Sequence, residues 1–310
     1  MRRLKNLLLN AFLVSAVCSY ADPHADAVYA QIRDLKHPTQ ADYRLIQNYL
    51  TFGNRPFLYR LKDYEQRAKD IKIIGRRPRE VPRSGSVAVN CAPNDRNRCV
   101  LVYSSFNERY PQGLERLVDL IKHSDFKGHV LYRVGGWPDV EGGSLTLAHL
   151  PYAFKVCYFK EAERLGFKRV FWLDAAIVPL VSLNDIFQTI EEQGYFTVGN
   201  THSVGQHFNT YAAAAMGITV EAAAQMPACS VGILGFDLTN ERAKKTLDRW
   251  YEITKTSEEA SYSSRPELNI ISVILNQMEM TEWLDLGRTA GSKTRIQPST
   301  VFWIDRAFVH

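Results

Sequence analysis

The chain has 310 residues, of which 45% are hydrophobic and 23% charged, a composition typical of a folded globular protein and not of a disordered one. The formal net charge is +5, but Arg2, Arg3 and Lys5 precede the first acidic residue, Asp22, so the chain without residues 1–21 carries only +2. No basic stripe interleaved with aromatic residues is present. The composition therefore argues against a nucleic-acid partner.

The N-terminus resembles an export signal. A basic start is followed by an apolar run over residues 7–17 and by the small residues Ser19 and Ala21, which predicts a signal peptide comprising residues 1–21. The run is shorter than the roughly 20 residues that span a bilayer, so no stable membrane span is expected. We expect a secreted, periplasmic or lumenal protein; the alternative is a membrane anchor formed by an uncleaved signal.

Four cysteines follow this signal: Cys91, Cys99, Cys157 and Cys229. An even number in an exported chain permits disulfides. Cys91 and Cys99 flank a short polar loop and are the favoured pair. The alternative is four reduced thiols, since Cys157 and Cys229 lie in apolar contexts where buried thiols are common.

The elements expected along the chain fall into two parts. Residues 22–85 predict a helical N-terminal extension that ends in a linker rich in Arg, Pro and Gly, and residues 86–310 form the main domain. Its expected strands are 99–105, 128–134, 168–174 and 195–200, and its expected helices are 113–124, 151–167 and 182–194, the last capped by Ser182 or Asn184. This alternation predicts an α/β fold with a mainly parallel sheet flanked by helices.

Ligands of such sheets collect at the carboxyl ends of the strands. The first two strand ends carry groups suited to a nucleotide or sugar: Tyr103, Ser104, Ser105, Asn107, Gly135, Gly136 and Trp137. The first four can stack on or hydrogen-bond a nucleobase or ribose, or simply cap the next helix. The glycines allow close backbone approach, and Trp137 either stacks on a sugar or fills the core.

The fourth strand end supplies Asn200, His202 and His207 in a glycine-containing loop. Loops on a rigid sheet commonly carry binding groups. These histidines are candidates for a metal ligand or an acid/base group, against the alternative of plain surface residues.

The third strand, "KRVFWLD", ends at Asp174 and is followed by Ala175 and Ala176. A lone carboxylate at a strand end ligates a metal, accepts a hydrogen bond from a ribose hydroxyl, or caps a loop. Asp174 is the strongest single candidate in the chain.

An ordered set of segments resembles the GT-A glycosyltransferases, most nearly the glycogenin and galactinol synthase type. The set covers about residues 99–280: a helix with a Phe-Lys step, an apolar strand ending where that family has Asp-x-Asp, and a helix opening before "IF". It continues with "CSVGILGFD", a helix bearing a Trp, and "RPELNIISVIL". The resemblance implies a GT-A-like fold and transfer of a sugar, with retention as in that type, from a UDP-sugar-like donor to an unknown glycan or protein acceptor.

The resemblance also implies roles for single residues. Asp174 matches the first Asp of the motif, a ligand of the metal or nucleotide, whereas Ala176 replaces the second. Lys155 matches a helix lysine that faces the donor. Glu267 stands in the place of the Asp of an Asp-Gln pair, with Asn269 beside it as a further catalytic candidate. The family's C-terminal metal-binding His has no match in this sequence.

The missing second Asp leaves two alternatives open. Water and diphosphate oxygens can complete the shell of a Mn or Mg ion at Asp174, or Lys155 or an arginine can supply positive charge without metal. It also leaves a second function open, a non-catalytic, degenerate GT-A domain that binds carbohydrate or a protein partner.

Overall fold

The computed structural model describes residues 84–104, 110–134, 138, 147, 150, 152–261, 263, 265–291 and 295–306. The predicted signal peptide and all but the last two residues of the predicted helical extension lie outside these ranges. The main element is a six-stranded sheet with the strand order β1-β3-β2-β4-β7-β6. Its strands are β1 (Ser84–Val89), β2 (Arg98–Ser104), β3 (Gly128–Val134), β4 (Arg169–Asp174), β6 (Tyr195–Ser203) and β7 (Pro227–Asp237).

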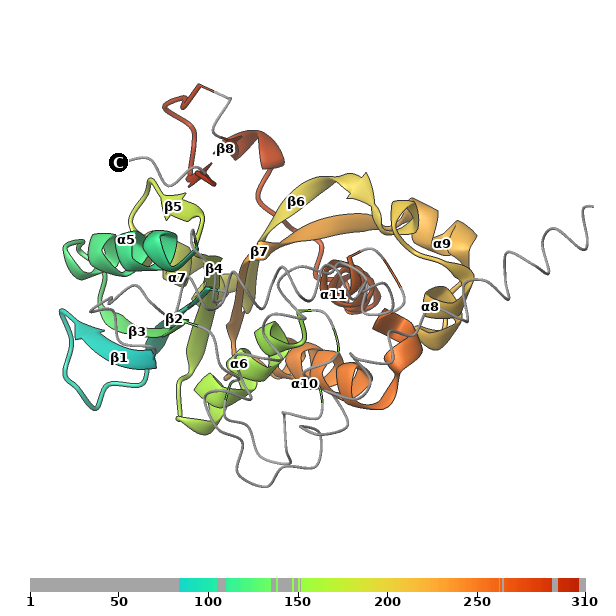
Figure 1. The fold of residues 1–310 in the computed structure, drawn as a ribbon, viewed down its shortest axis with the longest axis horizontal. Coiled ribbons are helices and arrows are strands. Elements are labelled where there is room, and N and C mark those ends of the chain that lie inside the picture. The colour runs from blue at the N-terminus through green and yellow to red at the C-terminus, as the bar shows by residue number, and fades with distance from the viewer. Residues whose placement is uncertain are drawn as a thin grey trace, which may run out of the picture.

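Helices cover both faces of this sheet (Figure 1). The long ones are α5 (Tyr110–Lys122), α6 (Phe154–Arg164), α7 (Leu183–Gln193), α10 (Glu241–Thr256) and α11 (Pro266–Gln277). Shorter ones are α8 (Thr210–Ala215), α9 (Val220–Gln225) and the 3-10 turns η2 (Val204–Gln206), η3 (Glu258–Ser261) and η4 (Leu286–Arg288). A small second sheet has the order β5-β9-β8, formed by Ile177–Pro179, Phe302–Ile304 and Thr289–Gly291.

The sheet is mixed, which corrects the expectation of a mainly parallel one. β2 pairs in parallel with β3 and β4, but β7 pairs antiparallel with both β4 and β6, and β1 pairs antiparallel with β3. β7 follows β6 along the chain through α8 and α9 and lies between β6 and β4, antiparallel to both. The α/β class with helices on both faces is as expected.

Alternation along the central strands divides the core into two layers. Val170 and Trp172 of β4 pack with α6, α10 and α11, whereas Phe171 and Leu173 pack with α5 and α7. Successive side chains of a strand point to opposite faces, so a strand buried on both sides is apolar at every position. This is why "VFWL" shows no polar residue before Asp174.

Local signals explain how α7 begins and ends. The Ser182 hydroxyl accepts a hydrogen bond from the backbone N–H of Asn184 (3.2 Å), which confirms Ser182, rather than Asn184, as the cap. Gly194 ends the helix at φ 87°, a left-handed conformation that glycine adopts without steric cost.

The main domain begins with the strand β1. β1 begins at Ser84, so the predicted boundary at residue 85 falls inside a strand. The segment "SGSVAV" starts with residues common in loops. It nevertheless forms an edge strand, because its backbone pairs antiparallel with residues Arg133 to Gly128 of β3.

The favoured Cys91–Cys99 disulfide is absent from the structure. All four described cysteines are free thiols. The Cys91 thiol donates to the carbonyl of Gly128 at 3.2 Å, and Cys99 lies fully buried in the core, where burial raises its pKa.

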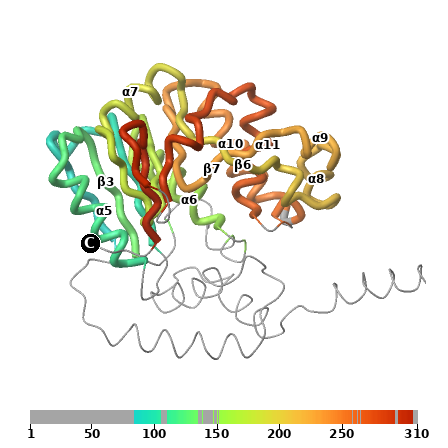
Figure 2. The backbone as a smooth tube through the Cα atoms, turned by 90° about the horizontal axis from the view of Figure 1, so that it is seen from above, coloured from blue at the N-terminus to red at the C-terminus, as the bar shows by residue number. Residues whose placement is uncertain are grey.

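The C-terminal strands are tied to the sheet through α5. Arg116 and Asp305 form a nearly buried ion pair with Nη1 and Oδ2 2.5 Å apart, and Figure 2 shows the red C-terminal segment beside α5.

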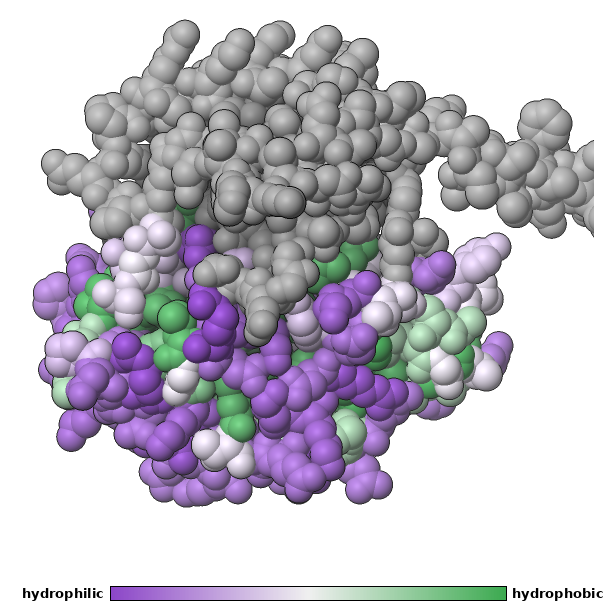
Figure 3. All heavy atoms as spheres, turned by 90° about the horizontal axis from the view of Figure 1, so that it is seen from below, coloured by the Kyte–Doolittle hydropathy of each residue, from purple (hydrophilic) through white to green (hydrophobic). Residues whose placement is uncertain are grey.

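Among the described residues, no helix has the length and apolar character required to cross a bilayer. The described surface in Figure 3 is mostly hydrophilic, with hydrophobic residues in small groups.

Candidate functional site

Asp174 lies at the carboxyl end of β4, and strand alternation sets the direction of its side chain. It follows Val170 and Trp172 on the sheet face covered by α6, α10 and α11. The Trp172 indole N–H donates to Asp174 Oδ1 at 2.7 Å. The Asp174 side chain is 41% exposed, so the carboxylate is anchored by a buried residue and still open to a ligand.

Lys155 of α6 approaches the same carboxylate from the covering helix. Its Nζ lies 3.2 Å from Asp174 Oδ1, 3.1 Å from the carbonyl oxygen of Val231, and 4.0 Å from Glu267 Oε1. The ammonium also lies 5.3 Å from the centre of the Trp172 ring, within range of a cation–π interaction. The strand, the helix α6 and the helix α11 therefore converge on one ammonium group.

The position of Lys155 is unfavourable for the fold by itself. The side chain is 5% exposed, and lysine is rarely buried unless it is paired. It also occupies the first turn of α6, which has no side-chain cap and where the helix dipole disfavours a cation. Contacts with Asp174, Val231 and Glu267 offset these costs. They hold the Lys155 ammonium in a position that burial and the helix dipole both disfavour.

Glu267 contributes a second, more buried carboxylate from the first turn of α11. Burial raises the pKa of this carboxyl above its ordinary value, with the Lys155 ammonium opposing the shift and Asp174 adding to it. Its Oε2 atom has no hydrogen-bond partner among the described residues. Asn269 is fully buried; its amide donates to Ser263 Oγ at 3.0 Å, and its Oδ1 likewise has no partner within the described part of the chain.

Tyr152 is a residue of this site that the sequence did not reveal. It precedes α6 with φ 62°, an uncommon conformation for a residue other than glycine, and its ring centre lies 5.8 Å from Lys155 Nζ. Burial, followed by the charges of Glu267 and Asp174, raises the pKa of its hydroxyl. Arg265, just before α11, acts on the same hydroxyl in the opposite direction and is a second missed residue.

Trp172 was also not predicted as a site residue, although its position in the strand indicates that it contacts Asp174. Residues two apart on a strand share a face, so the indole before Asp174 was a foreseeable hydrogen-bond donor. No comparable signal exists for the positive φ of Tyr152, because the sequence does not display backbone conformation.

The first strand end differs from expectation. Tyr103 is paired in register with Asp174, but it is only 4% exposed and its ring stacks on Phe154 with centres 4.3 Å apart. Its ring is therefore part of the core and not a platform for a nucleobase. Ser104 is buried, and its hydroxyl has no partner among the described residues. Ser105, Asn107, Gly135, Gly136 and Trp137 lie outside the described residues.

Asn200 and His202 lie on β6, and within the described part of the chain neither forms a hydrogen bond or ion pair with Asp174. His202 Nδ1 lies 2.6 Å from Gln206 Oε1, and its ring centre is 5.4 Å from that of His207. Burial and then the charge of Arg265 lower the pKa of His207. The charge of Arg265 therefore acts on His207 as well as on Tyr152.

The described residues offer no complete set of protein ligands for a divalent cation. Magnesium requires near-octahedral oxygen coordination, but Asp174 Oδ1 already accepts from Trp172 and contacts Lys155. Ala176 has no donor side chain, and Asp305, whose N–H bonds to the Ala176 carbonyl, directs its carboxylate to Arg116. Within the described ranges, no cluster of three or more His, Cys, Asp or Glu side chains is arranged to hold a metal.

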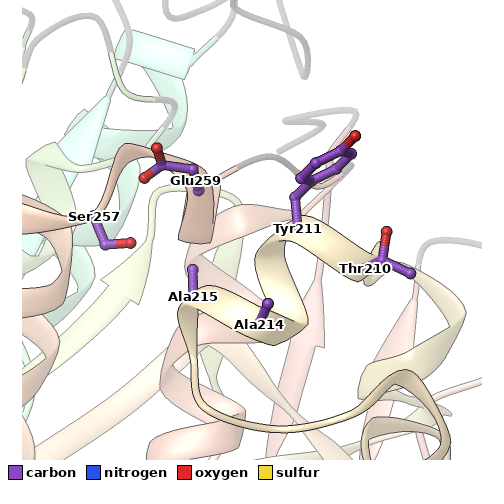
Figure 4. Close-up of a pocket in the computed structure, with 6 residues that line it drawn as sticks. All are labelled: Thr210, Tyr211, Ala214, Ala215, Ser257 and Glu259. Atoms are coloured by element: carbon purple, nitrogen blue, oxygen red, sulfur yellow. The ribbon is translucent and has the colours of Figure 1, made fainter. Parts of the chain in front are cut away.

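A concave region lies between α8 and η3 (Figure 4). This hollow has a volume of about 590 Å³, and its lining comprises Thr210, Tyr211, Ala214, Ala215, Ser257 and Glu259. The Tyr211 and Glu259 side chains stand on either side of an alanine floor, and Tyr211 is 65% exposed. None of these residues was predicted as a site residue.

Comparison of the chain with models of known protein families gives no match. A search among curated proteins also gives none.

Proposed function

We propose that the protein is a glycosyltransferase with a GT-A-like fold, transferring a sugar from a nucleotide-diphosphate donor to an acceptor hydroxyl. The observation that carries the proposal is the convergence of Asp174, Lys155 and Glu267 at the end of β4. All three were expected at one donor site from the order of segments in the sequence. The six-stranded mixed sheet with helices on both faces is compatible with this fold.

The site contains groups suited to both ends of such a donor. The half-exposed Asp174 carboxylate is an acceptor for ribose or sugar hydroxyls. The positive charge of Lys155, with that of Arg265 nearby, favours the diphosphate. In the transfer, the bond between the sugar C1 and the diphosphate oxygen breaks, and the diphosphate leaves with the electron pair. C1 bonds to the acceptor oxygen, whose proton passes to the departing diphosphate.

The acceptor side of the proposal rests on the hollow between α8 and η3. An exposed tyrosine ring offers the apolar face on which a sugar ring stacks, and Glu259, Ser257 and Thr210 offer hydrogen bonds to hydroxyls. η3 ends at Ser261 and α11 begins at Pro266, so one wall of the hollow leads directly to the element that carries Glu267. We therefore propose a glycan as the acceptor.

Calorimetric titration of the purified chain with nucleoside diphosphates, and measurement of free nucleotide released from nucleotide sugars, tests the donor. We expect one nucleotide to bind and Asp174→Asn to weaken binding by about tenfold or more. The control is Asp119→Asn, because the Asp119 side chain is 65% exposed and contacts only Lys122 in a loose pair at 3.9 Å. Absence of both binding and release would exclude the proposal. Glycan binding that survives Asp174→Asn, without nucleotide release, would instead support the non-catalytic alternative.

A further inference from the structure

Charged side chains of the protein already pair with one another around the end of β4. Two carboxylates, Asp174 and Glu267, face the Lys155 ammonium at 3.2 and 4.0 Å. The third, Asp305, is joined to the backbone at Ala176 and pairs with Arg116. A site built to hold a divalent cation directs several oxygen ligands at one point, and within the described residues no group of three or more His, Cys, Asp or Glu side chains does so.

The Lys155 ammonium is fixed in place by groups from three directions. It donates to the Val231 carbonyl of β7, contacts Asp174 of β4, and lies over the Trp172 ring. A divalent cation bound to Asp174 through Oδ1 would displace this ammonium or lie beside it as a like charge. Because the ammonium is buried, its charge is screened little by solvent, although Asp174 and Glu267 offset part of its effect on a ligand.

Positive potential also comes from the backbone. The first turn of α6 carries Lys155, and its cap residue, Ala153, makes no side-chain hydrogen bond. The first turn of α11, which follows Arg265, also lacks a side-chain cap. Helix N-termini stabilise anions through the helix dipole, and here two of them accompany a buried, fixed ammonium.

We propose that the protein neutralises the donor diphosphate with the Lys155 ammonium and the Arg265 guanidinium, and that it requires no divalent cation. The inference rests on the proposed glycosyltransferase function and settles which of the two charge arrangements the missing second Asp leaves open. Lys155 thereby replaces the cation that a second acid at position 176 would help to hold.

The test combines UDP calorimetry with electron paramagnetic resonance of Mn²⁺, using full-length protein freed of metal with EDTA. We expect the same UDP affinity, within twofold, in EDTA and in MnCl₂, and no Mn²⁺ bound at micromolar concentration in the presence of UDP. UDP binding that requires MnCl₂, or stoichiometric Mn²⁺ that Asp174→Asn removes, would overturn the inference and leave the proposed function intact. If UDP and the other nucleoside diphosphates bind under neither condition, the proposed function fails and the inference fails with it.

Charge substitutions provide a second readout. Lys155→Met should lower UDP affinity in EDTA at least tenfold, whereas Lys155→Arg should restore part of it because the charge is kept. Arg265→Gln, at an exposed position where folding is not at risk, should lower it about threefold to tenfold. Lys160→Met on the same helix is the control, because Lys160 pairs with Glu163 and Asp248 outside the site. Unchanged affinity in both Lys155→Met and Arg265→Gln would contradict the proposal.

Discussion

Gly232 of β7 lies directly against the carboxylate of Asp174: a Cβ built on this glycine would meet Oδ2 at 2.9 Å. Real Cβ contacts are essentially never that short, so the carboxylate occupies its position only because residue 232 has no side chain. The antiparallel register of β7 on β4, with Leu173 opposite Ile233, brings the two together. The space available to the Asp174 carboxylate at the end of β4 is thus set by a residue on a different strand.

Gly232→Ala should therefore displace the Asp174 carboxylate. We expect nucleotide affinity to fall by about tenfold, equivalent to about 1.4 kcal/mol, in calorimetric titration. Gly199→Ala is the matched control, because the nearest atom to its added Cβ is at 3.7 Å, an ordinary contact. Equal nucleotide affinity in the two variants would show that the position of Asp174 does not matter for binding.

Lys155→Met should lower the free energy of unfolding. Removing one partner of a buried ion pair typically costs about 3–5 kcal/mol, but Asp174 is 41% exposed and solvent reduces the loss, so we expect about 1–3 kcal/mol. Urea denaturation measures this change. Lys160→Met should cost less than about 1 kcal/mol, since both of its partners are partly exposed. A loss no larger at Lys155 than at Lys160 would contradict the account of Lys155 as a buried, paired charge.

His129 should make the stability of the fold depend on pH. Its ring is buried, with Nε2 3.4 Å from Arg96 Nη1 and Nδ1 3.3 Å from Ser86 Oγ. Burial lowers its pKa, the nearby charge of Arg96 lowers it further, and Asp95 opposes the shift. In the unfolded chain the ring takes up a proton near pH 6.5, before the folded protein does, so stability falls as pH drops below that value.

The measurement is the urea midpoint between pH 7.5 and pH 5, compared with that of His129→Asn. The variant lacks the titrating ring, so its stability should fall less steeply over this interval. An identical slope in the two proteins would assign the pH dependence to other groups.

Tyr211→Ala tests the hollow independently of the donor site. Because Tyr211 is 65% exposed, its removal should leave the thermal midpoint nearly unchanged. Nucleotide affinity should also be unchanged, while the KM for a glycan acceptor rises by about fivefold through loss of the stacking face. A core-packed ring such as Tyr251 of α10 is unsuitable as a control position, because its removal would also affect the core. Tyr211→Phe is the control variant, since it keeps the aromatic ring. A KM unaffected by Tyr211→Ala would remove the hollow from the acceptor proposal.

The sequence alone determined the alternating pattern of the central elements. The apolar run before Asp174, the helix capped by Ser182 and the amphipathic helix after β2 are all local signals. Local periodicity and capping express which backbone conformations and faces a short segment prefers. Asp174 was a candidate because it ends an apolar strand, and Lys155 because the order of segments resembles a family with a lysine on that helix.

Only the tertiary structure decided which groups meet. The antiparallel insertion of β7 placed Gly232 and the Val231 carbonyl beside Asp174 and Lys155, and the packing of Phe154 on Tyr103 made a predicted nucleotide-binding ring part of the core. The pairing of Asp305 with Arg116 is likewise a contact between segments far apart in the chain. Such contacts depend on strand order and register, which are set by the whole sheet and not by the residues that they bring together.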